Sequence, residues 1–180
     1  MIRITGGQWR GRRLRVPTKG TRPSSDMLRQ AIFNMLGDAV AGARVLDLFS
    51  GSGALAFEAL SRGAADAQLI EQAHQACQVI LCNIAALDIA DHVTLVRGVL
   101  PGALHRLSGE AFGLVFADPP FDSDFSHLWE SLAGVLAQEG TAVVQFPARK
   151  YGQSNWAYSV RSRLRTILGV VRFMVSYRFS

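Results

Sequence analysis

Apolar and polar residues along this chain alternate between buried runs of strand length and longer segments with helical spacing. The helical spacing covers residues 24–37, 54–60, 72–87, 100–107 and 126–137. The strand-like runs between them are Val45–Phe49, Ala67–Glu71, Val93–Val96, Gly113–Ala117 and Thr141–Phe146. Strands that alternate with helices predict a parallel sheet with right-handed crossovers. We therefore expect an α/β fold of the Rossmann-like kind, mostly parallel.

The two ends of the chain follow a different pattern. Ile2–Thr5 and Arg12–Val16 are short strand-like runs around three glycines, so they predict a small β-hairpin. Near the other end, apolar residues alternate with a period of two in Trp156–Leu168 and Val171–Phe179, with Gly169 between them. This pattern predicts an antiparallel hairpin. We expect one domain, with a hairpin arm over residues 1–23 and a catalytic body over residues 24–180.

Charge is strongly segregated along the sequence. Residues 1–30 carry eight Arg or Lys against one acid, residues 31–139 carry four against thirteen acids, and residues 140–180 carry seven and no acid. Basic ends around an acidic body favour a polyanionic partner, and nucleic acid above all. In Gln8–Arg13, Trp9 lies among arginines, a combination suited to phosphate contact and base stacking. The alternative is a solvated hairpin whose Trp9 packs on the body.

No apolar run reaches membrane-spanning length, and the first residues do not resemble a signal peptide, so we expect a cytoplasmic protein. Cys77 and Cys82 lie five apart in a helical pattern, which favours reduced thiols. His74 and His92 do not complete a set of metal ligands with them, so no metal is expected.

A glycine-rich turn follows the first buried run of the body. Gly51–Ala56 fits the pattern G-x-G-x-x-A, with Glu71 twenty residues after Gly51. Glycines permit a sharp turn, and the helix that follows offers free N–H groups. The pattern suits either NAD or S-adenosylmethionine, whose ribose hydroxyls Glu71 would bind. Asp47, just ahead of the glycines, suits a ligand with an ammonium group or a network of water molecules, and it would repel a pyrophosphate.

A second motif, Asp118-Pro119-Pro120-Phe121, follows the strand predicted at Gly113–Ala117. It should therefore lie at the carboxyl edge of the sheet, where open α/β folds bind ligands. The two prolines have no N–H groups, which leaves the carbonyl oxygens of Asp118 and Pro119 as acceptors beside a carboxylate. Phe121 can stack on a flat ligand. Acceptors beside a stacking ring suit the amino group of an aromatic base.

Together, these two motifs resemble the class I S-adenosylmethionine-dependent methyltransferases that modify exocyclic amines of nucleobases. The segments Arg3–Gly7, Arg10–Leu14 and Thr21–Asp26, running on into Ile32–Asn34, narrow the resemblance. Over nearly its whole length, the chain is similar to the bacterial 16S rRNA guanine-N2 methyltransferase family, of the methyltransferase D type.

The resemblance implies a role for each matching residue. Seven residues would hold S-adenosylmethionine: Asp47, Phe49, Gly51, Ser52, Gly53, Glu71 and Val99. Asp118 and Pro119 would hold the guanine amine, with Phe121 stacked on the base. The RNA would be bound by Arg3, Arg10, Arg12, Arg13, Arg22 and Phe121. The implied partner is 16S rRNA in an assembled or assembling 30S subunit, and the implied state is a monomer. Arg97–Val99 lacks the acid that often reads the adenine amine, so backbone groups would read it.

Three other functions fit parts of the sequence. An NAD(P)-linked oxidoreductase fits the glycine turn, but Asp47 and the Asp118–Phe121 motif oppose it. An adenine-N6 nucleic-acid methyltransferase fits both motifs but usually needs a larger recognition region. A non-enzymatic RNA-binding module fits the basic ends but has no need of the Asp118–Phe121 motif.

Overall fold

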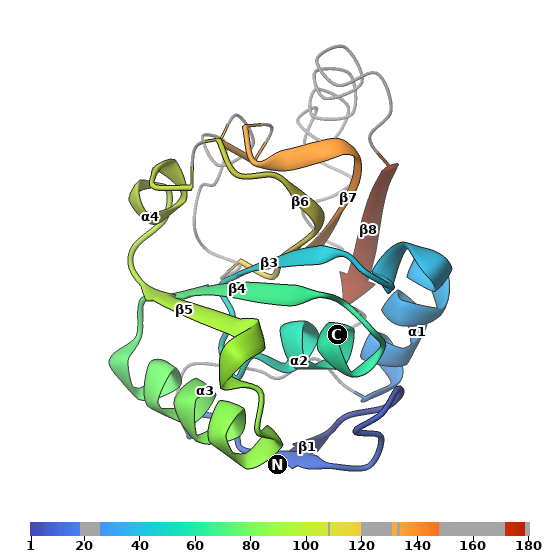
Figure 1. The fold of residues 1–180 in the computed structure, drawn as a ribbon, viewed down its shortest axis with the longest axis vertical. Coiled ribbons are helices and arrows are strands. Elements are labelled where there is room, and N and C mark those ends of the chain that lie inside the picture. Colours follow the sequence, from blue (N-terminus) through green and yellow to red (C-terminus); the bar gives the residue numbers. More distant parts are fainter. Residues whose placement is uncertain (19–25, 108, 120–130, 133, 148–171, 179–180) are drawn as a thin grey trace.

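The computed structural model describes residues 1–18, 26–107, 109–119, 131–132, 134–147 and 172–178 (Figure 1). Three features predicted from the sequence lie outside these residues: Arg22, Phe121 and the strand expected over 156–168. Within the described part of the chain, no helix is long and apolar enough to cross a membrane.

The body is built on a six-stranded sheet in which every neighbouring pair of strands is parallel. Its strands are β3 (Arg44–Leu48), β4 (Asp66–Glu71), β5 (Val93–Arg97), β6 (Phe112–Ala117), β7 (Leu136–Pro147) and β8 (Arg172–Arg178), in the order β5-β4-β3-β6-β7-β8. The chain moves outward from β3 to β5 and then returns to β6 on the other side of β3. The order therefore reverses between β3 and β6, and this is where such sheets bind ligands.

Helices cover both faces of the sheet, as the alternating pattern predicts (Figure 1). They are α1 (Asp26–Leu36), α2 (Ala54–Ser61), α3 (His74–Leu87) and α4 (Gly102–His105), with 3-10 turns at Gly37–Val40 and Ala90–His92. Successive residues of β3 point to opposite faces, so Val45 joins one hydrophobic core and Leu46 the other. The helices α1, α2 and α3 pack in the first core, and α4 packs in the second.

The predicted N-terminal hairpin is present but shorter than expected. Its strands β1 (Ile2–Arg3) and β2 (Arg13–Leu14) pair antiparallel. Ile4 and Leu14 are each 1% exposed and belong to the same core as α1, α2 and α3. The hairpin is thus packed on the body.

Around β7 the structure differs from the sequence prediction. The helix expected over 126–137 cannot reach Ala137, because β7 already begins at Leu136. Phe112 pairs with Leu136 and Leu114 with Thr141, so β7 carries extra residues between these two pairs. Glu139 lies in this irregular stretch with a φ of 64°, outside both regular helix and strand. The helical periodicity therefore continues into residues that form a distorted strand.

The last strand, β8, lies next to β7 and runs parallel to it. Its predicted hairpin partner falls outside the described residues, so the antiparallel C-terminal hairpin stays a prediction.

Candidate active site

Three carboxylates predicted to belong to the site meet at the carboxyl edge of the sheet. Asp47 is the second-last residue of β3, Glu71 is the last residue of β4, and Asp118 directly follows β6. The strand register pairs Leu48 with both Ile70 and Ala117, so the three acids come from adjacent strand ends. All three lie next to the point where the strand order reverses.

The turn from β3 into α2 has an unusual backbone. Phe49, Gly51 and Gly53 all have left-handed conformations, with φ values of 62°, 58° and 78°. A Cβ atom on Gly53 would overlap the ring of Phe57, so only glycine fits there. Phe49 adopts this conformation without being glycine, which costs free energy and is typical of functional turns. The N–H of Gly53 closes the turn by donating to Ser50 O at 2.7 Å.

Glu71 braces this turn from the neighbouring strand. It is 8% exposed; its Oε2 accepts a hydrogen bond from the N–H of Gly51, and its Oε1 accepts one from the N–H of Ala73, both at 2.8 Å. A carboxylate can accept about four hydrogen bonds, so Glu71 can hold the turn and still accept hydrogen bonds from ribose hydroxyls. The bracing role was missed from the sequence, although the spacing of twenty residues from Gly51 singled out the residue itself.

Asp47 is the most strongly perturbed group of the site. It is 2% exposed, and among the described residues its Oδ2 is a buried side-chain atom without a hydrogen-bond partner. The pKa of Asp47 is raised to about 8, mainly by burial; a hydrogen bond from the backbone of Ala56 opposes the shift, and the charges of Asp118 and Glu71 add to it. A buried, unpaired carboxyl oxygen suits a cationic or strongly donating ligand. These residues therefore fit the ammonium-bearing cofactor that the sequence motif implies.

The other predicted cofactor residue, Val99, follows β5 at the same edge. Its side chain is 66% exposed, which leaves an apolar surface open after the end of β5. The N–H of Gly98 donates to Glu71 O at 3.1 Å, so this segment is tied to the end of β4. Pro119 is buried and Asp118 is half-buried. Within the described ranges, no group of three His, Cys, Asp or Glu residues could hold a metal ion.

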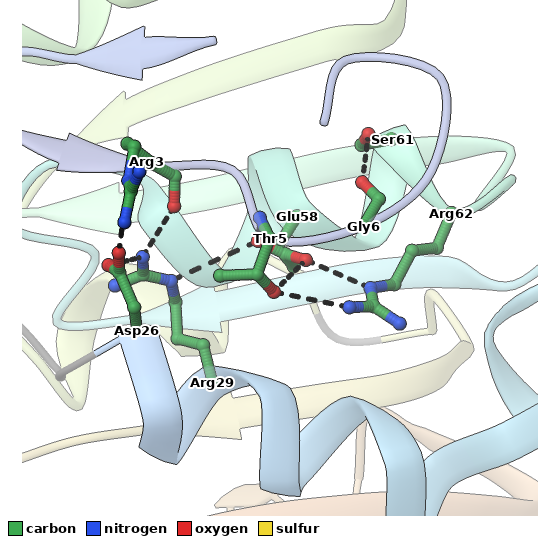
Figure 2. Close-up of polar contacts among 8 residues, drawn as sticks. All are labelled: Arg3, Thr5, Gly6, Asp26, Arg29, Glu58, Ser61 and Arg62. Carbon is green, nitrogen blue, oxygen red and sulfur yellow. Dashed lines mark hydrogen bonds and ion pairs between the residues drawn. The ribbon is translucent and has the colours of Figure 1, made fainter. Parts of the chain in front are cut away.

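A second polar cluster, which was not predicted from the sequence, joins the hairpin to α2 (Figure 2). Its centre is Glu58, which is 0% exposed. Glu58 accepts hydrogen bonds from the N–H and the hydroxyl of Thr5, both at 2.7 Å, and from Arg62 Nε at 2.9 Å. Arg29 Nε lies 3.9 Å from its Oε2. A single acid inside an otherwise apolar helix was the signal that could have revealed these partners.

Further contacts fasten the hairpin to the body. Arg29 Nη2 donates to Arg3 O at 2.6 Å and to Asp26 Oδ1 at 2.7 Å (Figure 2). Ser61 Oγ donates to Gly6 O at 2.6 Å. A Cβ atom on Gly7 would overlap the carbonyl group of Ser61, so the loop lies directly against the end of α2.

The aromatic residue of the hairpin and its arginines differ in burial. Trp9 is half-buried and packs on the core, which is the packing alternative rather than a free stacking ring. Arg10, Arg12 and Arg13 are exposed, and Arg12 Nη2 donates to Ala86 O at 2.5 Å. The side chain of Arg3 is 68% exposed and pairs with Asp26. The arginines therefore stay available as predicted contacts for RNA.

Comparisons with known proteins identify the family of this chain. The family model described as Conserved hypothetical protein 95 matches residues 2–167. "Ribosomal RNA small subunit methyltransferase D" of Escherichia coli strain K12 is 46% identical over 123 residues, which is 67% of this chain and 60% of that protein. The Haemophilus influenzae protein of the same name is 34% identical over 123 residues, 67% of this chain and 64% of that protein. The matched part thus spans less than two thirds of either relative.

Solved structures show the same architecture. A hypothetical protein of Thermus thermophilus, TTHA0928, superposes with a TM-score of 0.75 at 32% identity, covering 84% of this chain and 89% of that one. The Escherichia coli protein yhhF superposes with a TM-score of 0.71 at 41% identity, covering 79% and 80%. The chain belongs to the family described as Conserved hypothetical protein 95, the family of the ribosomal RNA small subunit methyltransferase D proteins.

Proposed function

We propose that this protein is an S-adenosylmethionine-dependent methyltransferase that methylates the exocyclic N2 amine of a guanine in 16S rRNA. The observation that carries the proposal is the buried Asp47 carboxyl group, whose Oδ2 has no hydrogen-bond partner among the described residues and which lies between Glu71, Asp118 and the glycine turn. A group of carboxylates of this kind favours a ligand with positive charge and disfavours the pyrophosphate of NAD. The names of the relatives, ribosomal RNA small subunit methyltransferase D, support an rRNA substrate.

In this proposal the cofactor is S-adenosylmethionine, and its electrophilic methyl group supplies the chemistry. Asp47 would pair with the ammonium group, Glu71 would accept hydrogen bonds from the ribose hydroxyls, and Val99 would lie against the adenine. The turn residues Phe49, Gly51, Ser52 and Gly53 complete the binding site. The absence of a side chain at Gly51 lets the ligand approach the backbone of the turn closely, while Gly53 leaves room for the ring of Phe57.

The chain's own groups prepare the nucleophile. The Asp118 carboxylate and the Pro119 carbonyl accept hydrogen bonds from the guanine N2 amine, and Phe121 stacks on the base. The amine lone pair is delocalised in free guanine, so acceptors that favour a pyramidal nitrogen aim this lone pair at the methyl group. Catalysis then rests on positioning and preorganised dipoles. The target base has to leave its stack to reach these acceptors.

The test is a methylation assay with two substrates, unmodified 16S rRNA and small subunits assembled from it. The full chain is incubated with labelled S-adenosylmethionine, and the product nucleoside is identified by mass spectrometry. N2-methylguanine at one position is the expected product. N6-methyladenine would replace the guanine assignment with the adenine one. Absence of label from both substrates would contradict the proposed reaction.

The cofactor assignment has its own test. S-adenosylmethionine should raise the melting temperature of the protein, because a ligand that binds only the folded state stabilises it. NAD and NADP serve as controls and should leave the melting temperature unchanged. The opposite result would favour an oxidoreductase.

A further inference from the structure

A buried asparagine on α3 connects the basic hairpin with the glycine turn. Asn83 is 1% exposed. Its Nδ2 donates to Ser52 O and to Arg15 O, both at 3.0 Å, and its Oδ1 accepts a hydrogen bond from the N–H of Arg15 at 2.9 Å. One side-chain amide thus bonds both backbone groups of Arg15 and one carbonyl of the turn. Along the chain, Ser52 lies 31 positions from Asn83 and Arg15 lies 68 positions from it.

The bond to Ser52 fixes the orientation of a peptide unit in the turn. In a trans peptide, the carbonyl group and the following N–H lie in one plane and point in opposite directions. Here the carbonyl of Ser52 bonds to Asn83, and the N–H of Gly53 bonds to Ser50 O. The plane is therefore held on both sides. Glu71 holds the N–H of Gly51 in the same way, so β4 and α3 together fix the turn.

The other end of this connection is the basic segment. Arg15 directly follows β2 and is exposed, as are its neighbours Arg12 and Arg13. Arg12 also reaches α3 through Ala86 O. Phosphate groups bound by these arginines would therefore restrain the backbone that Asn83 holds.

We propose that Asn83 is a positioning residue that couples RNA binding at the basic hairpin to cofactor binding at the glycine turn. The inference rests on the proposed function and adds a mutual dependence between its two ligands. RNA that restrains the backbone of Arg15 also restrains the Ser52–Gly53 peptide, because Asn83 bonds to both. A cofactor that restrains this peptide restrains Arg15 in the same way. Such coupling between two equilibria is reciprocal.

The test measures the affinity for S-adenosylhomocysteine, an unreactive stand-in for the cofactor, with and without saturating 16S rRNA. In the wild-type protein, the RNA should tighten this affinity by about five-fold or more, the lower end of ordinary coupling. Asn83→Asp keeps the acceptor for the N–H of Arg15 but loses both donated bonds. It should bind S-adenosylhomocysteine roughly ten-fold more weakly, and the RNA should no longer tighten binding. Gln78→Ala, an exposed position on the same helix, should behave as wild type.

Each outcome bears on a different claim. Wild-type protein that binds no S-adenosylhomocysteine would contradict the proposed function. Suppose that the wild-type protein binds S-adenosylhomocysteine and that Asn83→Asp binds it with the same affinity and the same effect of RNA. This result would overturn the coupling alone. Weaker binding by Asn83→Asp with the same effect of RNA would overturn it too. If the variant fails to fold, hydrogen exchange of the wild-type protein decides. S-adenosylhomocysteine must then slow the exchange of amides in residues 9–15, and no slowing there would overturn the proposal.

Discussion

At the scale of single residues, Asp47 illustrates how burial creates a site. Its carboxyl group is enclosed at the end of β3 and faces the charges of Glu71 and Asp118, and its Oδ2 has no hydrogen-bond partner within the described part of the chain. Its pKa is about 8 in the folded protein and has an ordinary value in the unfolded chain. The folded state therefore binds more protons than the unfolded state between about pH 4 and pH 8.

The sign of the resulting pH dependence follows from linkage. Because the folded state holds the extra proton, the contribution of Asp47 to the free energy of unfolding falls as pH rises through this window. Asp47→Asn removes the titration and keeps the shape. We expect urea unfolding at pH 5 and at pH 8 to show a steeper loss of stability in wild type than in Asp47→Asn. Parallel losses in the two proteins would contradict the raised pKa.

Asp118 should separate catalysis from cofactor binding. It lies after β6, beyond the turn that Glu71 and Asn83 fix, so its loss should leave that turn intact. We expect Asp118→Ala to abolish methyl transfer to rRNA and to keep the affinity for S-adenosylmethionine within a few-fold of wild type. Titration calorimetry checks binding, and a single-turnover assay checks transfer. Lost binding with a high residual rate would reverse the assigned roles.

At the scale of elements, the hairpin and α2 form one unit around Glu58. The carboxylate of Glu58 faces Arg29 and Arg62 and receives two bonds from Thr5. A charged group at this depth is tolerated because it is paired and hydrogen-bonded. Removing one partner leaves the remaining charges buried without compensation.

The Glu58→Gln variant tests this unit. It replaces an acceptor by an amide that faces two guanidinium groups, so we expect the free energy of unfolding to fall by about 3 kcal/mol. Glu110→Gln is the matched control, because Glu110 pairs with Arg44 at the surface, where such a pair contributes less than about 1 kcal/mol. Urea unfolding measures both. In Glu58→Gln, trypsin should also cut faster within Arg10–Arg15. Equal losses in the two variants would show that the cluster does not hold the hairpin.

The elements that could be predicted from the sequence are those whose signal is local. The buried runs of β3 and β6 and the glycines after β3 carry their own pattern, so the sheet and the edge that holds Asp47 and Asp118 were predicted correctly. The contacts of Glu58 and Asn83 with the hairpin were missed because Thr5 lies 53 residues from Glu58 and Arg15 lies 68 residues from Asn83, beyond any periodicity. The predicted end of the helix at Ala137 was wrong, because the irregular start of β7 keeps apolar residues at helical spacing.

At the scale of the whole molecule, charge and site occupy different parts of the chain. The acidic middle segment contains Asp47, Glu71 and Asp118, and it would repel RNA without the basic ends. The hairpin has the densest group of arginines in the described part of the chain, with five in residues 1–18. Arg12 already donates to α3, so Arg10 and Arg13 are the freer pair for phosphate.

Salt dependence tests the role of the hairpin arginines. Each phosphate contact adds about 0.7–0.9 to the slope of log affinity against log salt concentration. Replacing Arg10, Arg12 and Arg13 together by Ala should weaken rRNA binding, flatten the slope by about two units, and leave the affinity for S-adenosylmethionine unchanged. Arg106→Ala, an exposed arginine of the body, serves as the control. An unchanged slope with unchanged turnover would transfer the role to Arg161, Arg163 and Arg165, which lie outside the described residues.

The fastened hairpin also has a consequence for how the chain is made. Its residues precede α2 and α3 in the sequence, so the ribosome synthesises the hairpin before the surfaces that bury Ile4 and Leu14 exist. Contacts between such distant segments require long loops to close, and they form late in folding. During synthesis, the closely spaced arginines around β2 favour contact of this segment with water until α2 and α3 have been made. Newly made chains therefore expose a cationic segment before the cofactor site has been assembled.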